Sequence, residues 1–268
     1  MSTIQPFPLD LAQVGYSYVE RPNNVLLDLL ADHGFQANPR GRILDVGCGA
    51  GANARAFRKK YPEATIVGIE PNAQAAALAR EVCDEVVTGD AQEWAASASQ
   101  APFDAVVLSD VLEHIADPMR FLRELTGIRA VQDALWVISV PNYAVWYNRI
   151  FTLFGRFDYA WSGLYDRTHL RFYTRRSLLQ LLANAHLGPI DIRCSPAIVQ
   201  SAAPILRRFF ERDVAKGDHL SLPRSRAYQL YERAIEPIEQ KICSLWPELL
   251  GFQIIVAAKL GNSKRQFG

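Results

Sequence analysis

Three glycines at every second position, preceded by an apolar strand and an acid, form the most informative segment of the chain. Residues 43–51 read Ile-Leu-Asp-Val-Gly-Cys-Gly-Ala-Gly. Glycine has no Cβ, so a loop with this spacing can bring its backbone very close to a ligand. Asp45 stands two residues before Gly47, where its carboxylate would repel a phosphate and attract a positive charge. The expected chemistry is therefore the binding of a cationic ligand where a strand ends.

The spacing of Gly47, Gly49 and Gly51 separates two classes of cofactor. A dinucleotide site favours G-x-G-x-x-G, with a pyrophosphate at the N-terminus of the following helix. Here the pattern is G-x-G-x-G, and position 52 is alanine. S-adenosylmethionine carries an ammonium and a sulfonium and no phosphate, so it fits this loop better. We expect the glycine backbone to approach its methionine portion and Asp45 to balance its positive charge.

Acidic residues also follow the next three predicted strands. Glu70 ends the second strand, where a carboxylate can accept hydrogen bonds from both ribose hydroxyls, as it also would in a nicotinamide site. Asp90 follows the third strand and could accept from the adenine amine, with the Ala91 N–H available to a ring nitrogen. Asp110 lies just beyond the fourth strand. Each acid alone could simply cap a helix, but the set behind a glycine loop predicts one cofactor site.

Two histidines are candidates for the proton transfer that methylation of a hydroxyl requires. Alignment of the acceptor dominates such a displacement, and a positioned histidine adds about 10²–10⁴-fold. His169 lies in a segment expected to cover the site, and His114 follows the fourth strand beside Asp110 and Glu113. The structural alternatives are that His169 only holds the covering segment in place, and that His114 opens a helix and packs against the cofactor.

An alternation of strands and helices must bring these residues together. The predicted strands are residues 43–46, 65–70, 85–88, 103–109, 134–140, 190–194 and 252–259. The predicted helices are residues 52–60, 72–81, 119–125 and 177–185, with another beginning at Pro22. This order indicates an α/β fold with a doubly wound, mainly parallel sheet, whose ligand lies beyond the carboxyl ends of the strands.

Composition places the chain among near-neutral globular proteins. It has 268 residues, of which 49% are hydrophobic, and a net charge of +1. No apolar run approaches the roughly 20 residues of a membrane-spanning helix, and we expect no signal peptide and a cytoplasmic location. The four cysteines form no C-x-x-C pair, so we expect buried apolar side chains in a reducing compartment rather than disulfides or a metal site.

We expect four segments along the chain. Residues 1–40 form a helical lead-in, and residues 41–200 form the cofactor-binding core, which includes a covering segment at 142–174. Residues 201–250 form a helical insertion, and residues 251–268 form the final strand and tail.

These motifs together resemble class I S-adenosylmethionine-dependent methyltransferases over most of the chain. The resemblance rests on the glycine loop and on residues 103–118, which include Asp-Val-Leu-Glu-His. Residues 140–142, 155–157 and 166–174 are similar to a subgroup that contains methionine-biosynthesis protein W and bacterial methyltransferases of surface-glycan pathways. The resemblance implies a Rossmann-like, seven-stranded sheet with an antiparallel last strand. The family often has Pro-Gly-Gly before the fifth strand, where this chain has Ile-Arg-Ala-Val-Gln-Asp.

A metal site is a further implication of resemblance. Asp110, Glu113, His114 and His169 resemble the ligand set of small-RNA 3′-end methyltransferases and of some quinone O-methyltransferases. A divalent ion there would lower the pKa of an acceptor oxygen. The first acid is aspartate here instead of glutamate, and metal-free relatives carry the same Glu-His pair. We therefore assign no metal ligand and keep metal-dependent O-methyl transfer as an alternative.

Residues 142–176 combine aromatic side chains, most of which we expect to pack, with an unusual number of arginines. The arginines are Arg149, Arg156, Arg167, Arg171, Arg175 and Arg176. They could form a solvated face or bind an anionic acceptor, such as a nucleotide- or lipid-linked sugar. Nucleic acid is not expected, because Asp158 and Asp166 are interleaved with them.

The insertion before the last strand carries apolar residues at helical spacing with basic flanks. They include Ile205, Leu206, Phe209, Phe210, Ile235, Ile238, Ile242, Leu245 and Trp246. We expect a cap on the core or a homodimer face, with peripheral membrane contact through 204–246 as the alternative.

The sequence thus predicts S-adenosylmethionine-dependent methyl transfer to an oxygen, or less readily a nitrogen, of a small polar acceptor. Two other classes stay open. One is a catalytically weak cofactor-binding protein that assists another enzyme, and the other is a nicotinamide-dependent oxidoreductase.

Overall fold

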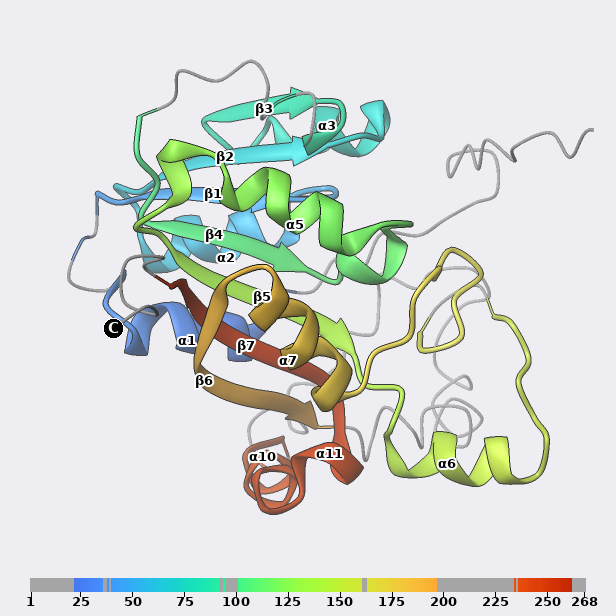
Figure 1. Ribbon diagram of the computed structural model, residues 1–268. Coiled ribbons are helices and arrows are strands. Elements are labelled where there is room, and N and C mark those ends of the chain that lie inside the picture. Colours follow the sequence, from blue (N-terminus) through green and yellow to red (C-terminus); the bar gives the residue numbers. More distant parts are fainter. Residues whose placement is uncertain are drawn as a thin grey trace, which may run out of the picture.

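A seven-stranded sheet organises the computed structural model, which describes residues 22–35, 38, 40–91, 94, 101–160, 163–196, 234 and 236–261. The strand order is β3-β2-β1-β4-β5-β7-β6 (Figure 1). The strands are β1 Arg42–Val46, β2 Thr65–Glu70, β3 Glu85–Thr88, β4 Ala105–Ser109, β5 Leu135–Pro141, β6 Leu187–Pro196 and β7 Gly251–Leu260. β7 is antiparallel to both β5 and β6, and the other neighbours pair in parallel. The predicted fold class and its antiparallel last strand are confirmed.

Helices cover both faces of this sheet (Figure 1). The helices are α1 Asn24–Asp32, α2 Ala52–Lys60, α3 Ala73–Ala79, α5 Pro118–Thr126, α6 Trp146–Leu153, α7 Arg175–Asn184, α10 Glu236–Leu245 and α11 Pro247–Leu250, with short 3₁₀ turns at Leu112–His114 and Arg129–Val131. Val106 and Leu108 of β4 belong to the core under α5 and α7, whereas Ala105 and Val107 belong to the core under α1 and α2. Alternate residues of one continuous apolar run therefore serve both cores.

Side-chain caps set the starts of α3, which follows β2, and of α5, which follows β4. Asn72 Oδ1 accepts hydrogen bonds from Gln74 N at 2.9 Å and Ala75 N at 3.0 Å, which begins α3. Asp117 Oδ1 accepts from Arg120 N at 3.0 Å, and Pro118 stands at the first position of α5. These caps place each helix directly after the loop that leaves the strand, so that the loops gather at one edge of the sheet.

The cysteine prediction is wrong in part. Cys194 of β6 and Cys243 of α10 form a disulfide that spans 49 residues of sequence. Cys48 and Cys83 are free and buried, as expected. The packing of α10 against β6 brings the two partners together, and no local spacing signals such a contact. A reducing compartment therefore no longer follows from the cysteines.

Two of the expected segments lie largely outside the described residues. They are the lead-in before residue 22 and the insertion from 197 to 233, which includes Ile205, Leu206, Phe209 and Phe210. Within the described residues, α10 ends at Leu245, as the helical reading of the insertion predicted. None of the described helices is long and apolar enough to span a bilayer.

Candidate active site

The predicted acids of β1, β2 and β4 meet where the strand order changes direction. β1 and β4 are neighbours in the sheet, although β2 and β3 come between them in the chain. Asp45 pairs in register with Gly68 of β2 and with Val107 of β4. In open α/β sheets, this switch point is where the loops separate and leave a ligand crevice.

The glycine loop after β1 requires its glycines. Gly47, Gly49 and Gly51 have φ angles of 71°, 54° and 84°, which lie in the left-handed region. A Cβ on Gly47 would lie 2.7 Å from Val111 Cγ2, and one on Gly51 would lie 2.8 Å from Val82 Cγ2. The conformation of the loop is therefore fixed both by its backbone angles and by its close contact with the side chains of Val111 and Val82.

Glu70 fastens this loop from the end of β2. One of its carboxylate oxygens accepts a hydrogen bond from Gly49 N at 2.9 Å, and the other accepts from Asn72 N at 2.9 Å. The side chain is 4% exposed. Each oxygen has a second lone pair, so the carboxylate can still accept from ribose hydroxyls while it orders the loop.

Asp45 is the buried acid that best fits a cationic ligand. Its side chain is fully buried, and neither carboxylate oxygen has a hydrogen-bond partner in the described part of the chain. Burial, and secondarily the charge of Glu70, raises the pKa of Asp45 to about 7. A buried carboxylate without a partner is costly, and an ammonium group would relieve that cost. The residues present therefore fit S-adenosylmethionine, with Asp45 and the glycine loop at its methionine end and Glu70 at its ribose.

Asp110 has a strained backbone that two polar side chains hold in place. Its φ is 55°, although it is not glycine. Ser139 Oγ donates to Asp110 Oδ1 at 3.1 Å, and Gln253 Nε2 donates to Oδ2 at 2.5 Å. Burial raises the pKa of Asp110 to about 6, and these two hydrogen bonds oppose that rise. The sequence analysis missed Ser139 and Gln253, although each is a polar residue within an apolar strand.

Asp90 and Ala91 follow β3 as predicted. Asp90 is exposed, its carbonyl accepts from Trp94 N at 3.1 Å, and Ala91 is 5% exposed. Their adenine-binding role stays a prediction.

His114 and His169 lie side by side, although 55 positions separate them in sequence. Their ring centroids are 4.9 Å apart in an edge-to-face arrangement. Glu113 O accepts from Leu170 N at 2.7 Å and from Arg171 N at 3.0 Å, which ties the His169 loop to the turn that carries His114. His114 ends this 3₁₀ turn, Leu112–His114, so the expectation that it opens a helix is wrong.

Both rings have a defined tautomer. His169 Nδ1 faces Leu164 O at 3.2 Å, and His114 Nδ1 faces Thr168 O at 3.2 Å. Carbonyl oxygens only accept, so each Nδ1 carries the proton and each Nε2 keeps a lone pair. Burial lowers the pKa of His114 to about 4, with a further effect from His169, and burial also lowers the pKa of His169. Both rings are therefore neutral at pH 7.

Glu113 completes a cluster with these two histidines. One oxygen of Glu113 and one ring nitrogen of each histidine lie within 4.8 Å of one another. Glu113 is 1% exposed, and its carboxylate oxygens have no hydrogen-bond partner among the described residues. Burial first, and then the charges of Asp110 and Asp166, raise the pKa of Glu113 well above its usual range.

The covering segment is less packed than the sequence suggested. Of its described aromatic side chains, only Tyr173 is buried. The exposed ones are Trp146, Phe151, Phe154, Phe157 and Tyr159. The expectation that most would pack is met only in part. Tyr143, Tyr147 and Tyr165 are half-buried and pack against Val145 and Leu164, whereas Phe151, Phe157 and Tyr159 make edge-to-face ring contacts at the surface.

The arginines of this segment are mostly exposed. Arg175 forms an ion pair with Glu248 at 3.4 Å, and Arg171 Nη2 donates to Ala116 O. Arg149 Nε donates to Ala144 O at 2.6 Å. Binding of an anion by these side chains stays a prediction.

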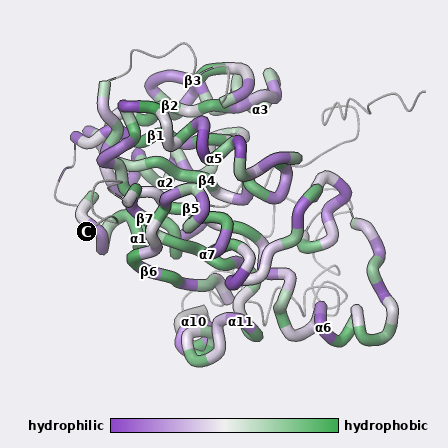
Figure 2. The backbone as a smooth tube through the Cα atoms, in the orientation of Figure 1, coloured by the Kyte–Doolittle hydropathy of each residue, from purple (hydrophilic) through white to green (hydrophobic). Residues whose placement is uncertain are grey.

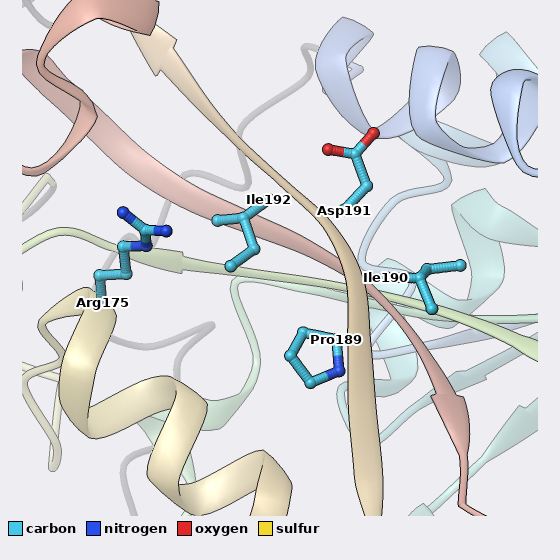
Figure 3. Close-up of a pocket in the computed structure, with 5 residues that line it drawn as sticks. All are labelled: Arg175, Pro189, Ile190, Asp191 and Ile192. Atoms are coloured by element: carbon cyan, nitrogen blue, oxygen red, sulfur yellow. The ribbon is translucent and has the colours of Figure 1, made fainter.

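A groove of about 350 Å³ lies elsewhere, along β6 (Figure 3). It is lined by Arg175, Pro189, Ile190, Asp191 and Ile192. Asp191 is paired with His33 and Arg193. Apart from Arg175, one of the candidate anion-binding arginines, the groove contains none of the predicted cofactor-binding or catalytic residues, so we assign no catalytic role to it.

Comparisons with known proteins agree with the fold and the cofactor. Residues 18–190 match the family described as "Methyltransferase domain". The ubiquinone biosynthesis O-methyltransferase of Paracidovorax citrulli is 35% identical over 102 residues, which are 36% of this chain and 41% of that protein. The trans-aconitate 2-methyltransferase of an Azoarcus species is 28% identical over 98 residues, which are 34% of this chain and 38% of that protein.

A solved S-adenosylmethionine-dependent methyltransferase from Archaeoglobus fulgidus has the same fold. Its TM-score is 0.51 at 19% identity, over 93% of this chain and 98% of that chain. The chain spans less than half the length of the two curated relatives named above. The match to the family model covers most of this chain. The chain belongs to the methyltransferase-domain family, and its cofactor is S-adenosylmethionine.

Proposed function

We propose that this chain is an O-methyltransferase that acts on a small, polar, anionic acceptor. The observation that carries the proposal is the pair of neutral histidines, His114 and His169. His114 ends the turn after β4, the strand that pairs with β1 and its Asp45. The cofactor supplies an activated methyl group and its own leaving group. The protein must therefore bind the acceptor in line and accept a proton from its hydroxyl.

His169 is the proposed general base. Its Nδ1 is held by the Leu164 carbonyl, so Nε2 is the nitrogen that can accept a proton. The lowered pKa of His169 keeps the ring neutral, and hence able to act as a base, at neutral pH. His114, next to it, is fixed by Thr168, whose hydroxyl donates to Asp166 at 2.7 Å. We assign His114 to orienting the acceptor, whereas burial keeps His169 unprotonated.

Two observations support this class of acceptor, namely the arginines of the covering segment and the chemistry of one relative. The exposed arginines of the covering segment support an anionic group, such as the phosphate of a nucleotide- or lipid-linked sugar. An O-methyltransferase of ubiquinone biosynthesis is among the relatives, which supports oxygen over nitrogen as the target. A surface-glycan precursor remains our first candidate within this class.

The test is methyl transfer from labelled S-adenosylmethionine into a polar small-molecule extract, analysed by mass spectrometry. His169→Gln should lower turnover by about 10²-fold or more, while the cofactor dissociation constant stays within about threefold because the variant leaves the glycine loop intact. His186→Asn is the matched control, since His186 is exposed and Asn accepts its positive φ.

Two outcomes would contradict the proposal. Unchanged turnover in His169→Gln would show that His169 is not the general base. Tight cofactor binding with no methylated product from any extract fraction would favour the alternative of a non-catalytic partner protein.

A second candidate, metal-dependent O-methyl transfer, is favoured by Glu113. Its buried carboxylate has no hydrogen-bond partner among the described residues, and it lies beside two histidines that each keep an Nε2 lone pair. Each histidine also donates Nδ1–H to a carbonyl, which is the outer contact that metal-binding histidines usually make. A divalent ion in this cluster would act as a Lewis acid toward the acceptor hydroxyl.

Direct binding of Co²⁺ separates this candidate from the base mechanism. Visible absorption of the Co²⁺-titrated protein should show one site that is lost in Glu113→Gln and kept in Glu63→Gln, an exposed control. Full turnover after removal of divalent ions, with no Co²⁺ spectrum, would rule the metal out and leave His169 as the base.

A further inference from the structure

Helix α6 has its polar and apolar sides reversed relative to an ordinary surface helix. Its buried residue is Asn148, which is 1% exposed. Trp146, Ile150 and Phe151 are exposed, and Leu153 is 81% exposed. A surface helix normally turns its apolar stripe toward the core. The apolar side of α6 is therefore not what holds it to the described part of the protein.

Polar contacts hold the inner side of α6 instead. Asn148 Nδ2 donates to Tyr143 O, and Tyr165 OH donates to Asn148 Oδ1. Thr152 Oγ1 donates to the same oxygen at 3.4 Å. The bond from Tyr165, together with the half-buried Tyr147 that packs against Val145 and Leu164, sets the rotation of the helix about its axis. The outward direction of the apolar side chains is thus specified by the structure.

The apolar surface continues past the end of α6. Phe154 is 75% exposed, and Phe157 and Tyr159 are also exposed. Figure 1 shows α6 at the edge of the described body, and Figure 2 shows hydrophobic residues along it. We call residues 146–159 the α6 surface. Large exposed apolar surfaces of this kind mark sites of interaction.

Charge around the α6 surface indicates the kind of partner. Residues 142–176 contain six arginines, two aspartates and no lysine or glutamate, whereas the whole chain has 29 basic and 28 acidic residues. Asp166 is buried, so the exposed acid among them is Asp158. The rest of the chain is therefore net acidic, and positive charge is concentrated beside the exposed aromatic side chains.

We propose that the α6 surface docks on an anionic lipid membrane. Trp, Tyr, Phe and Leu side chains would enter the headgroup boundary, and Arg149 and Arg156 would pair with lipid phosphates. Both arginines are exposed. A second copy of the chain fits less well, because a two-fold contact through this surface would bring its arginines against one another. The proposal does not depend on the reaction or on the identity of the acceptor.

Docking there would place the acceptor side of the site at the lipid surface. α6 follows the end of β5 directly, and the same segment continues to His169. Asn142 is paired with Tyr173 across the base of this segment. An acceptor with a lipid-embedded tail could then reach the histidines without leaving the membrane.

The experiment is co-sedimentation of the full chain with vesicles of phosphatidylcholine containing phosphatidylglycerol. Leu153→Ser with Phe154→Ser should weaken binding by at least about tenfold, and Arg156→Gln should reduce its dependence on salt. The matched control is Leu245→Ser with Trp246→Ser, a pair that is 84% and 65% exposed at the end of α10. Circular dichroism and a cofactor dissociation constant verify that each variant is folded.

Three results would overturn the proposal. The first is no binding to the vesicles that contain phosphatidylglycerol. The second is loss of binding in the Leu245–Trp246 variant but not in the Leu153–Phe154 variant. The third is a dimer in solution that the Leu153–Phe154 substitutions dissociate, which would assign the α6 surface to a second copy.

Discussion

We propose that Asp45 couples cofactor binding to proton release. Its carboxyl group is buried, and its pKa is raised to about 7, mainly by burial. An ammonium group beside it would favour the ionised form, so binding would lower this pKa and release a proton. The buried acid would in this way favour a cationic ligand.

We predict that affinity for S-adenosylmethionine falls as the pH is lowered from 7.5 to 5.5. Below about pH 7, Asp45 is protonated in the free protein and its attraction for the ammonium group is lost. Asp45→Asn should weaken binding at pH 7.5 by roughly 1.5–3 kcal/mol, the range for hydrogen bonds to charged groups, and should remove most of the pH dependence. Isothermal titration calorimetry at several pH values measures both effects.

Asp133→Asn, on an exposed residue, provides the matched control for Asp45→Asn. A pH dependence that is the same in Asp45→Asn and in the unsubstituted protein would show that another group is responsible.

Asp110 supports a second prediction, through Gln253. Replacement of Gln253 by Leu removes its hydrogen bond to Asp110 Oδ2. At pH 7 this bond is made to a largely ionised carboxylate, because the pKa of Asp110 is about 6. The loss of unfolding free energy should be about 1.5–3 kcal/mol at pH 7 and smaller at pH 5, where Asp110 is protonated. Urea unfolding at the two pH values checks this. An equal loss at both would mean that only the contacts of Gln253 with Ser195 and Asn23 matter.

At the scale of elements, local patterns predicted the strands and the positions of the acids at their ends. The bounds of β2, β3 and α2 match the predicted ranges, because continuous apolar runs end at glycine, proline or a capping residue. Asp45, Glu70 and Asp110 could be placed because parallel strands bring their carboxyl ends to one edge. Periodicity and spacing within a single element were sufficient for these assignments.

Contacts between distant elements could not be predicted in this way. The edge-to-face histidine pair depends on two hydrogen bonds from the His169 loop to Glu113 O, and main-chain bonds of this kind leave no mark on residue types. The Cys194–Cys243 disulfide depends on how α10 packs on β6. The outward apolar side of α6 depends on Asn148, and a helical pattern does not specify which side faces the protein.

The glycine loop gives a prediction at this scale. Gly47→Ala should destabilise the protein by roughly 1–3 kcal/mol, from the positive φ and from the contact with Val111 Cγ2. Val111→Ala in the same chain should recover part of this loss, because it removes the atom that the new Cβ would meet, while the backbone strain remains. A double-mutant cycle by thermal unfolding measures the coupling. Strict additivity would show that the loop shifts away from Val111.

At the scale of the whole molecule, the buried acids and the buried histidines make the free energy of unfolding depend on pH in opposite ways. The raised pKa of Asp45 means that the folded state keeps a proton that the unfolded state has released, so this contribution is lost as the pH rises through about 4–7. The lowered pKa of His114 means that the unfolded state takes up a proton first, so this contribution is lost as the pH falls from about 6.5 toward 4. Between pH 5 and 7 the two trends act against each other.

Substitution of Asp45 and substitution of His114 should therefore change the pH dependence of the unfolding free energy in opposite directions. Relative to the unsubstituted protein without cofactor, Asp45→Asn should gain stability as the pH rises from 5 to 7.5, and His114→Asn should gain stability as it falls over the same range. Over this range the upper limit is about 3 kcal/mol for Asp45 and about 2 kcal/mol for His114, at about 1.4 kcal/mol per pKa unit. Urea unfolding in the presence of a chelator, which excludes metal binding at Glu113, measures the profiles. If the unfolding free energies of the two variants depend on pH in the same way, the pKa values of Asp45 and His114 are not shifted in the directions that burial requires. Opposite tilts would establish that the folded protein favours the neutral form of both groups over this pH range.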